Sequence, residues 1–168
     1  MKKEVRLYNI LLPIWLLWIF PQVWLFILPG NLLIDCLVLT ITLAALKHRS
    51  KWAVVRQLWW RFWMLGFLAD AAGVLWMVLA LLPVWARTGT AYPLWWDKSL
   101  SYVMHNPFGH PAAFLWTLAA VALAGYCIYR FDKRAMKNCV LLSEGERHKI
   151  ALAMAIITAP WLFFISLY

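Results

Sequence analysis

The feature that most constrains the fold is a long apolar run from Phe62 to Pro83 that contains a single charged residue, Asp70. A helix rises 1.5 Å per residue, so this run is long enough to cross the hydrocarbon core of a bilayer, which is about 30 Å thick. A charged Asp at the centre of a span costs ~2.5–3.5 kcal/mol on insertion scales, so it is normally paired, protonated or functional. The run therefore predicts a membrane-spanning helix with one ionisable site in its middle.

Small residues of the same helix share a face with that site. At 3.6 residues per turn, Gly66 and Gly73 fall on the same stripe as Asp70. Small residues let another helix approach closely in lipid. Asp70 is therefore expected to face protein, or a cavity within it, and the two glycines are predicted packing positions. Ala120 and Ala124 offer a second close-packing face further along the chain.

The composition of the whole chain agrees with a membrane protein. Its 168 residues are 65% hydrophobic and 14% charged, with a mean hydropathy of +0.72, whereas a soluble domain is nearer half apolar and a quarter charged. The pattern predicts five spans, at residues 8–28, 32–46, 62–85, 112–129 and 149–168. Interfacial segments are expected at residues 47–61, 94–105 and 131–142. Residues 1–168 are thus predicted to form one all-α integral membrane domain, a bundle of about five transmembrane helices.

Local signals place the ends and breaks of these spans. Pro29-Gly30-Asn31 is a turn signal, which predicts that the second span returns antiparallel to the first. Ser143 and Glu146 have the spacing of a capping box, which predicts a helix start there. Because proline removes a backbone hydrogen bond, breaks are expected in the first and fifth spans, at Pro13, Pro21 and Pro160.

The basic residues predict the orientation. The chain has 16 Lys and Arg against 7 Asp and Glu, and on the five-span topology only Arg87 and Lys98 fall on the side opposite the N-terminus. Since Lys and Arg accumulate in cytoplasmic loops, the N-terminus is predicted to be cytoplasmic and the C-terminus outside. This favours a multi-pass protein of the inner (plasma) membrane whose cations face anionic headgroups, and it disfavours nucleic acid as a partner. The 13 tryptophans fit the same environment, because Trp concentrates at membrane interfaces.

Asp70 is the main candidate for binding a substrate or an ion. Thr40 in the second span and Thr158 in the fifth lie at a similar depth, so their hydroxyls could hydrogen-bond its carboxyl. The alternative is structural: a neutral Asp that joins helices through hydrogen bonds.

A second set of candidates is expected at the outer side. Asp35 and Gln22 lie at comparable depth in the outer half of their spans, and His105 and His110 could cover them from the loop. Together they would form a polar vestibule. The structural alternatives are that Asp35 complements a helix dipole and that the histidines are solvated. Two histidines with carboxylates can ligate a transition metal, but no spacing enforces it, so neither a metal nor another cofactor is predicted.

Catalytic patterns are weak. The serines have no nucleophile context, there is no glycine-rich phosphate loop, and the three cysteines form no CxxC pair, so no catalytic residue is predicted. Broken helices near a polar midplane residue favour a transporter, or an integral transporter subunit, for a small solute or cation. The alternative is a non-catalytic membrane assembly or regulatory protein. It would act through a partner membrane protein or a second copy, by way of its tryptophan-rich surfaces and small-residue stripes.

Overall fold

The computed structural model describes residues 21–80, 82 and 98–165. These residues form four α-helices, named α2 (Pro21–Ala45), α3 (Lys51–Leu79), α6 (Pro111–Ala135) and α7 (Glu144–Ile157). Short 3-10 segments connect or follow them: η1 (Leu100–Met104), η2 (Pro107–Gly109), η3 (Met136–Asn138) and η4 (Trp161–Phe164).

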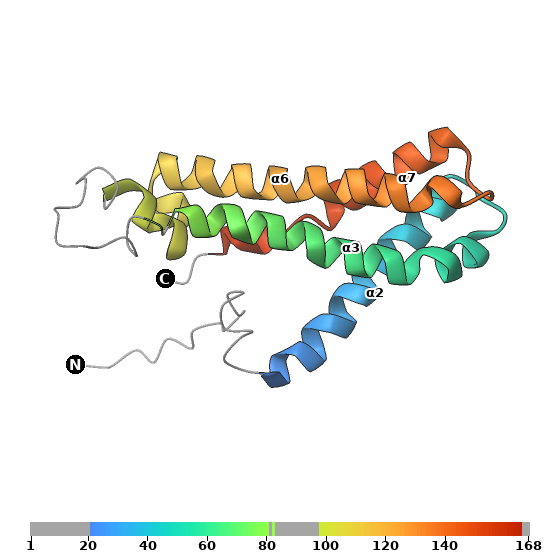
Figure 1. Cartoon of the computed structure of the whole chain (residues 1–168), viewed down its shortest axis with the longest axis horizontal. Helices are drawn as coiled ribbons and strands as arrows, with labels where there is room; N and C mark the ends of the chain where they lie inside the picture. The colour runs from blue at the N-terminus through green and yellow to red at the C-terminus, as the bar shows by residue number, and fades with distance from the viewer. Residues whose placement is uncertain (1–20, 81, 83–97, 166–168) are drawn as a thin grey trace.

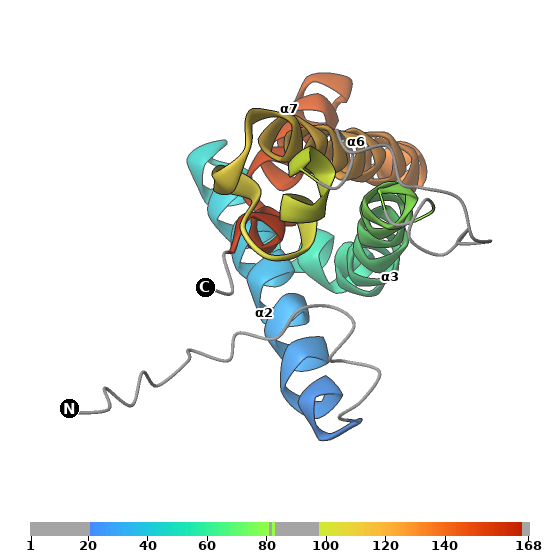
Figure 2. The ribbon, with the colours of Figure 1, turned by 90° about the vertical axis from the view of Figure 1, so that its left-hand side faces the viewer.

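The helices form a bundle in which α6 packs against both α3 and α7. Helices α3 and α6 run antiparallel along the long axis, and α7 packs against α6 (Figure 1). Helix α2 contacts α3 and α7, but its N-terminal half points away from the other helices in both views (Figures 1 and 2). The α2–α3 turn and the segment before α7 lie at the same end of the bundle. We call this the basic end, because it carries Lys47, Arg49, Lys51, Lys133, Arg134 and Lys137.

Among the described residues, three helices are long and apolar enough to cross a membrane: Leu25–Ala45, Lys51–Leu79 and Pro111–Asn138. Many large apolar side chains on their outer faces are exposed, including Leu33, Ile41, Leu68, Leu75 and Leu115. Such surfaces are unfavourable in water and suit a lipid environment. The described residues therefore form an all-helical bundle in which three helices are able to span a membrane.

Helix α2 differs from the sequence-based prediction. It runs through Pro29, Gly30 and Asn31 without interruption, so the turn predicted there, and the reversal between the first two spans, are wrong. A membrane helix tolerates proline because neighbouring groups satisfy freed backbone atoms. Beside the proline, the indole nitrogen of Trp63 on α3 donates to the Leu28 carbonyl at 3.1 Å, which ties this part of α2 to α3. The carbonyl that Pro29 leaves without a helical donor is that of Leu25, four residues earlier. Residues 8–20 of the first predicted span lie outside the described residues.

The last predicted span is not one continuous helix. Helix α7 has 14 residues and ends at Ile157, and the chain then turns at Pro160 before η4. Fourteen residues extend only about 21 Å, which is less than the hydrocarbon thickness of about 30 Å. The start of α7 is as predicted: the Ser143 hydroxyl accepts from the Glu146 backbone, and the Glu146 carboxylate accepts from the Ser143 backbone at 2.8 Å, so the capping box is confirmed.

Helices α3 and α6 pack closely at Gly73, at a level between the two apolar clusters of the core. A Cβ placed on Gly73 would lie 3.2 Å from both the Ala120 carbonyl oxygen and the Ala124 Cβ. One turn away, the indoles of Trp76 and Trp116 each donate to the backbone carbonyl of the other residue, at 3.2 Å. The larger cluster lies toward the basic end and draws on all four helices; the smaller one, at the other end, contains Ala80, Leu100, Val103 and Ala113.

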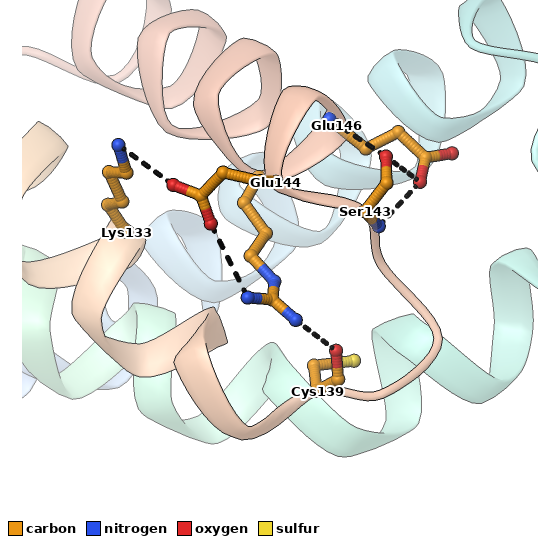
Figure 3. Close-up of polar contacts among 6 residues, drawn as sticks. Lys133, Cys139, Ser143, Glu144 and Glu146 are labelled. Carbon is orange, nitrogen blue, oxygen red and sulfur yellow. Dashed lines mark hydrogen bonds and ion pairs between the residues drawn. The ribbon is translucent and has the colours of Figure 1, made fainter.

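A polar network holds the start of α7 at the basic end (Figure 3). Lys133 on α6 pairs with Glu144 at 3.1 Å, and Arg147 donates to the Cys139 carbonyl at 3.0 Å. Glu146 also contacts the Nδ1 atom of His48, in the α2–α3 turn, at 3.0 Å. Hydrogen bonds from the Ser143 backbone, then from its hydroxyl and from His48, lower the pKa of Glu146 from 4.5 to about 2.

This network predicts a defined acid sensitivity. Because the folded pKa of Glu146 is depressed, its ionised form stabilises the fold above pH 4.5, and this contribution is lost as the pH falls toward 2. Glu146→Gln should lose the contribution already at neutral pH, so its melting temperature in detergent should fall less than that of the wild type between about pH 7 and about pH 3. Equal acid sensitivity of the two proteins would contradict the assignment.

The same cap can be tested at neutral pH. Ser143→Ala removes the capping hydroxyl and should destabilise the protein by about 1 kcal/mol in denaturant unfolding. Ser50→Ala is the matched control, because Ser50 precedes α3 without a side-chain capping bond. A comparable loss in both variants would mean that the capping bond contributes nothing specific.

Candidate functional site

Two carboxyl groups lie near the α2–α3 contact, Asp35 on α2 and Asp70 on α3. The Oδ2 atom of Asp35, on α2, lies 3.7 Å from the position that a Cβ on Gly66 would occupy. Asp70 is one turn further along α3, on the same face as Gly66. We call the two carboxyls the Asp35–Asp70 pair. Gly66 thus makes room for a carboxylate of α2, whereas Gly73 makes room for α6.

This position corrects the interpretation of Asp35. The sequence places it about one turn inside the start of a span, where a helix dipole would favour an anion. Because α2 begins at Pro21, Asp35 instead lies in the middle of a 25-residue helix, away from the dipole's positive end. The structure groups it with Asp70 rather than with a vestibule near the loop.

Asp70 lacks the hydroxyl partners that its depth suggested. Its Oδ1 atom is buried without a hydrogen-bond partner. Thr40 donates to the Cys36 carbonyl at 2.7 Å, and Thr158 donates to the Met154 carbonyl at 2.8 Å. Threonines in helices often bond the carbonyl four residues earlier, so both hydroxyls are used within their own turns.

The two predicted histidines have local roles. His105 Nδ1 contacts the Ser101 carbonyl at 3.1 Å, and His110 Nδ1 accepts from the Ala112 backbone, which caps the start of α6. Asp70 lies one turn from Gly73 along α3, and Gly73 contacts Ala120 and Ala124 of α6. Ala120 is ten residues after His110 in the same helix, and Asp70 lies on the far side of Gly73 from His110. His110 is therefore at least ~15 Å from the Asp35–Asp70 pair along the helix axis, and the predicted vestibule is not assembled.

Gln22 lies in the first turn of α2, and its side chain is outside the described part of the structure. Within the residues that the structure describes, no three His, Cys, Asp or Glu side chains come together as metal ligands.

Asp132 is a buried carboxyl that the sequence analysis did not select. It lies on α6 with 1% of its surface exposed, and its Oδ2 atom has no hydrogen-bond partner. The basic residues around it suggested an interfacial segment from residue 131, but α6 continues to Ala135. The missed signal is spacing: Asp132 stands four residues after Ile128 and four before Met136, both of which belong to the core.

A surface groove between α6 and α7 has a different character. It has a volume of about 430 Å³ and is lined by aliphatic and aromatic side chains, among them Val121, Tyr126, Leu152 and Trp161. The candidate carboxyls do not line it. The groove is therefore apolar and separate from the candidate carboxyls, of which Asp132 is buried and Asp35 and Asp70 are half-buried.

No family model, curated protein or solved structure matches this chain.

Proposed function

We propose that this chain is a multi-pass membrane protein that transports a small solute or cation, alone or as the integral subunit of a transporter. The observation that carries the proposal is the Asp35–Asp70 pair, formed by carboxyls of two different apolar helices. Ionisable residues inside spans are costly, and they typically mark substrate or ion pathways.

The electrostatics of the pair favour binding of positive charge. Two ionised carboxylates repel each other strongly in a medium of low dielectric constant. A proton or a cation between them removes the repulsion, so the site suits a ligand that arrives and leaves with a positive charge. A purely structural Asp would be expected to bond the neighbouring helix, whereas Asp70 Oδ1 is buried without a partner.

The proposal includes an orientation. With the basic end in the cytoplasm, as the positive-inside rule favours, α2 and α6 run from the outer to the cytoplasmic face and α3 runs back. The predicted count of five spans is not kept, because α2 is continuous where the first two spans were to be separated and α7 is shorter than a span. The cytoplasmic N-terminus and the external C-terminus stay predictions. The inner (plasma) membrane location and the contact with anionic headgroups are part of the same proposal.

The direct test is cation flux through purified protein in liposomes. Wild-type proteoliposomes should take up protons or sodium ions faster than empty liposomes when a potassium gradient and valinomycin set a negative interior. Asp70→Asn keeps the shape of the side chain but not its charge, and it should lower the flux by about ten-fold or more, since an amide cannot exchange the proton or balance the cation.

Glu144→Gln serves as the control, because Glu144 is an exposed carboxylate at the basic end and lies outside the interior. Its flux should equal that of the wild type. Wild-type flux in Asp70→Asn would remove Asp70 from the mechanism, and the absence of flux of either cation in the wild type would count against transport itself.

A further inference from the structure

The groove between α6 and α7 is not used by the proposed transport function. Its volume is about 430 Å³, and its lining comes from α6, from α7 and from the segment that follows α7. The two helices approach closely at small residues of this lining: a Cβ placed on Gly125 would lie 3.2 Å from the Ala155 carbonyl oxygen and 3.9 Å from the Ala159 Cβ. Larger side chains, such as Leu118 and Leu152, line the rest. The contact thus leaves an apolar depression on the surface of the bundle.

The groove has about the length of one lipid leaflet. Its lining residues on α6 run from Leu118 to Tyr129, which is about 16 Å at 1.5 Å per residue. The hydrocarbon core of a bilayer is about 30 Å thick, so the hydrocarbon of one leaflet is about 15 Å thick. Helix α6 is long and apolar enough to span a membrane, and Tyr129 lies toward the basic end. The groove can therefore hold an acyl chain from the headgroup level at the basic end to the bilayer midplane.

Two polar side chains of the lining make hydrogen bonds at opposite ends of the groove. At the end away from the basic residues, the indole nitrogen of Trp161 donates to the Ile156 carbonyl at 2.9 Å, so that polar atom is already used. At the other end, the Tyr129 hydroxyl contacts the Nδ1 atom of His148 at 2.9 Å. The apolar length of the groove suits a hydrocarbon chain, and its polar end at Tyr129 suits a headgroup.

Cations lie where the groove reaches the basic end. On α6, Arg130 stands four residues after the lining residue Tyr126, and on α7, Lys149 stands three residues before the lining residue Leu152. Residues three or four apart share a helix face. Both cations are exposed, and so is His148 between the two helices. Basic residues at the cytoplasmic ends of membrane helices recognise anionic headgroups, so the charge at this end of the groove complements an anionic lipid.

We propose that the α6–α7 groove binds one anionic phospholipid, with an acyl chain along the two helices and the phosphate at the level of Arg130 and Lys149. The nearby acid Glu144 pairs with Lys133, so it does not neutralise these two cations. An uncharged lipid would fill the groove but would leave the cations without a partner. The inference does not rest on the transport proposal, because it requires only that α6 and α7 lie in a membrane.

The experiment counts the lipids that stay on the protein. The protein is released from bilayer discs that contain equal amounts of phosphatidylglycerol and phosphatidylcholine with the same acyl chains, and the complexes are weighed by native mass spectrometry. The wild type should retain a single phosphatidylglycerol. It should prefer this lipid over phosphatidylcholine by about ten-fold or more, since each cation near a membrane surface attracts an anionic lipid by about five-fold.

Two variants separate the acyl chain from the headgroup. Ala122→Trp places an indole in the groove from an exposed position of its lining, and it should remove the retained lipid because the ring occupies the volume of the acyl chain. The double variant Arg130→Gln with Lys149→Gln should still retain a lipid, but its preference for phosphatidylglycerol should fall by about ten-fold or more.

Each variant has a matched control. Ala71→Trp makes the same change at an exposed alanine of α3 that does not line the groove. Arg49→Gln with Lys137→Gln removes the same charge from exposed positions at the basic end that do not line it either. Both controls should retain one phosphatidylglycerol with the preference of the wild type.

Several outcomes would overturn the inference. Retention of no lipid by the wild type, or of both lipids equally, would show that the groove does not select an anionic headgroup. An equal loss in a variant and its control would show that the lipid has no particular place on the protein. A lipid-free wild-type dimer that Ala122→Trp converts to monomers would assign the groove to a second copy of the chain. If Ala122→Trp does not fold, the exposed charge variants decide, and an unchanged preference in the Arg130 and Lys149 variant overturns the site.

Discussion

Replacing Gly73 with leucine should force α3 and α6 apart and destabilise the bundle by about 3 kcal/mol, at the upper end of the usual overpacking range. A Cβ at this position would already lie 3.2 Å from the Ala120 carbonyl oxygen and from the Ala124 Cβ, and 3.0 Å from Phe163. The phenyl ring can rotate away, but the other two atoms move only with the backbone of α6. The measurement is the free energy of unfolding in mixed detergent micelles.

Gly30→Leu is the matched control. Gly30 also lies inside an apolar helix, but no atom comes within 4 Å of a Cβ placed on it. Leucine is a better helix former than glycine by roughly 0.5–1 kcal/mol, so this variant should be neutral or slightly more stable. Equal stability of the Gly73→Leu and Gly30→Leu proteins would show that α3 and α6 do not pack as described.

Truncating Phe62 to alanine should destabilise the protein by about 3–5 kcal/mol, as is usual for a buried Phe. Phe62 is 1% exposed and is the largest fully buried side chain of the described residues. Its ring belongs to the cluster that joins all four helices, with Leu39 and Met154 among its members. Removing it leaves a cavity that rigid helices cannot fill, and the loss is measured in the same unfolding experiment.

Phe26→Ala controls for the change in residue type. Phe26 lies on the outlying half of α2 with 80% of its surface exposed, so its truncation opens no cavity and should change the free energy of unfolding much less. If Phe26→Ala were as destabilising as Phe62→Ala, the core would have to include the N-terminal half of α2.

Several features follow from local sequence. A helix over the apolar run around Asp70 is apparent because hydrophobicity and length suffice for it. The small-residue stripe is apparent for a similar reason: helical periodicity puts Gly73 on the face of Asp70 wherever the helix lies. The capping box is decided within four residues, Ser143 to Glu146, and needs no tertiary contact.

Only the tertiary structure shows where α2 is continuous, which residue faces Asp35, and that Asp132 is buried. Pro29-Gly30-Asn31 reads as a turn by composition, yet α2 continues through it, with Trp63 of α3 bonding the adjacent carbonyl. The partner of Asp35 depends on which face of α2 meets Gly66, and no local pattern contains that information. Asp132 stands among cations that suggest a surface segment, and only the packing of α6 inside the bundle buries it. Periodicity tells which residues share a face, whereas the neighbouring helix determines what that face meets.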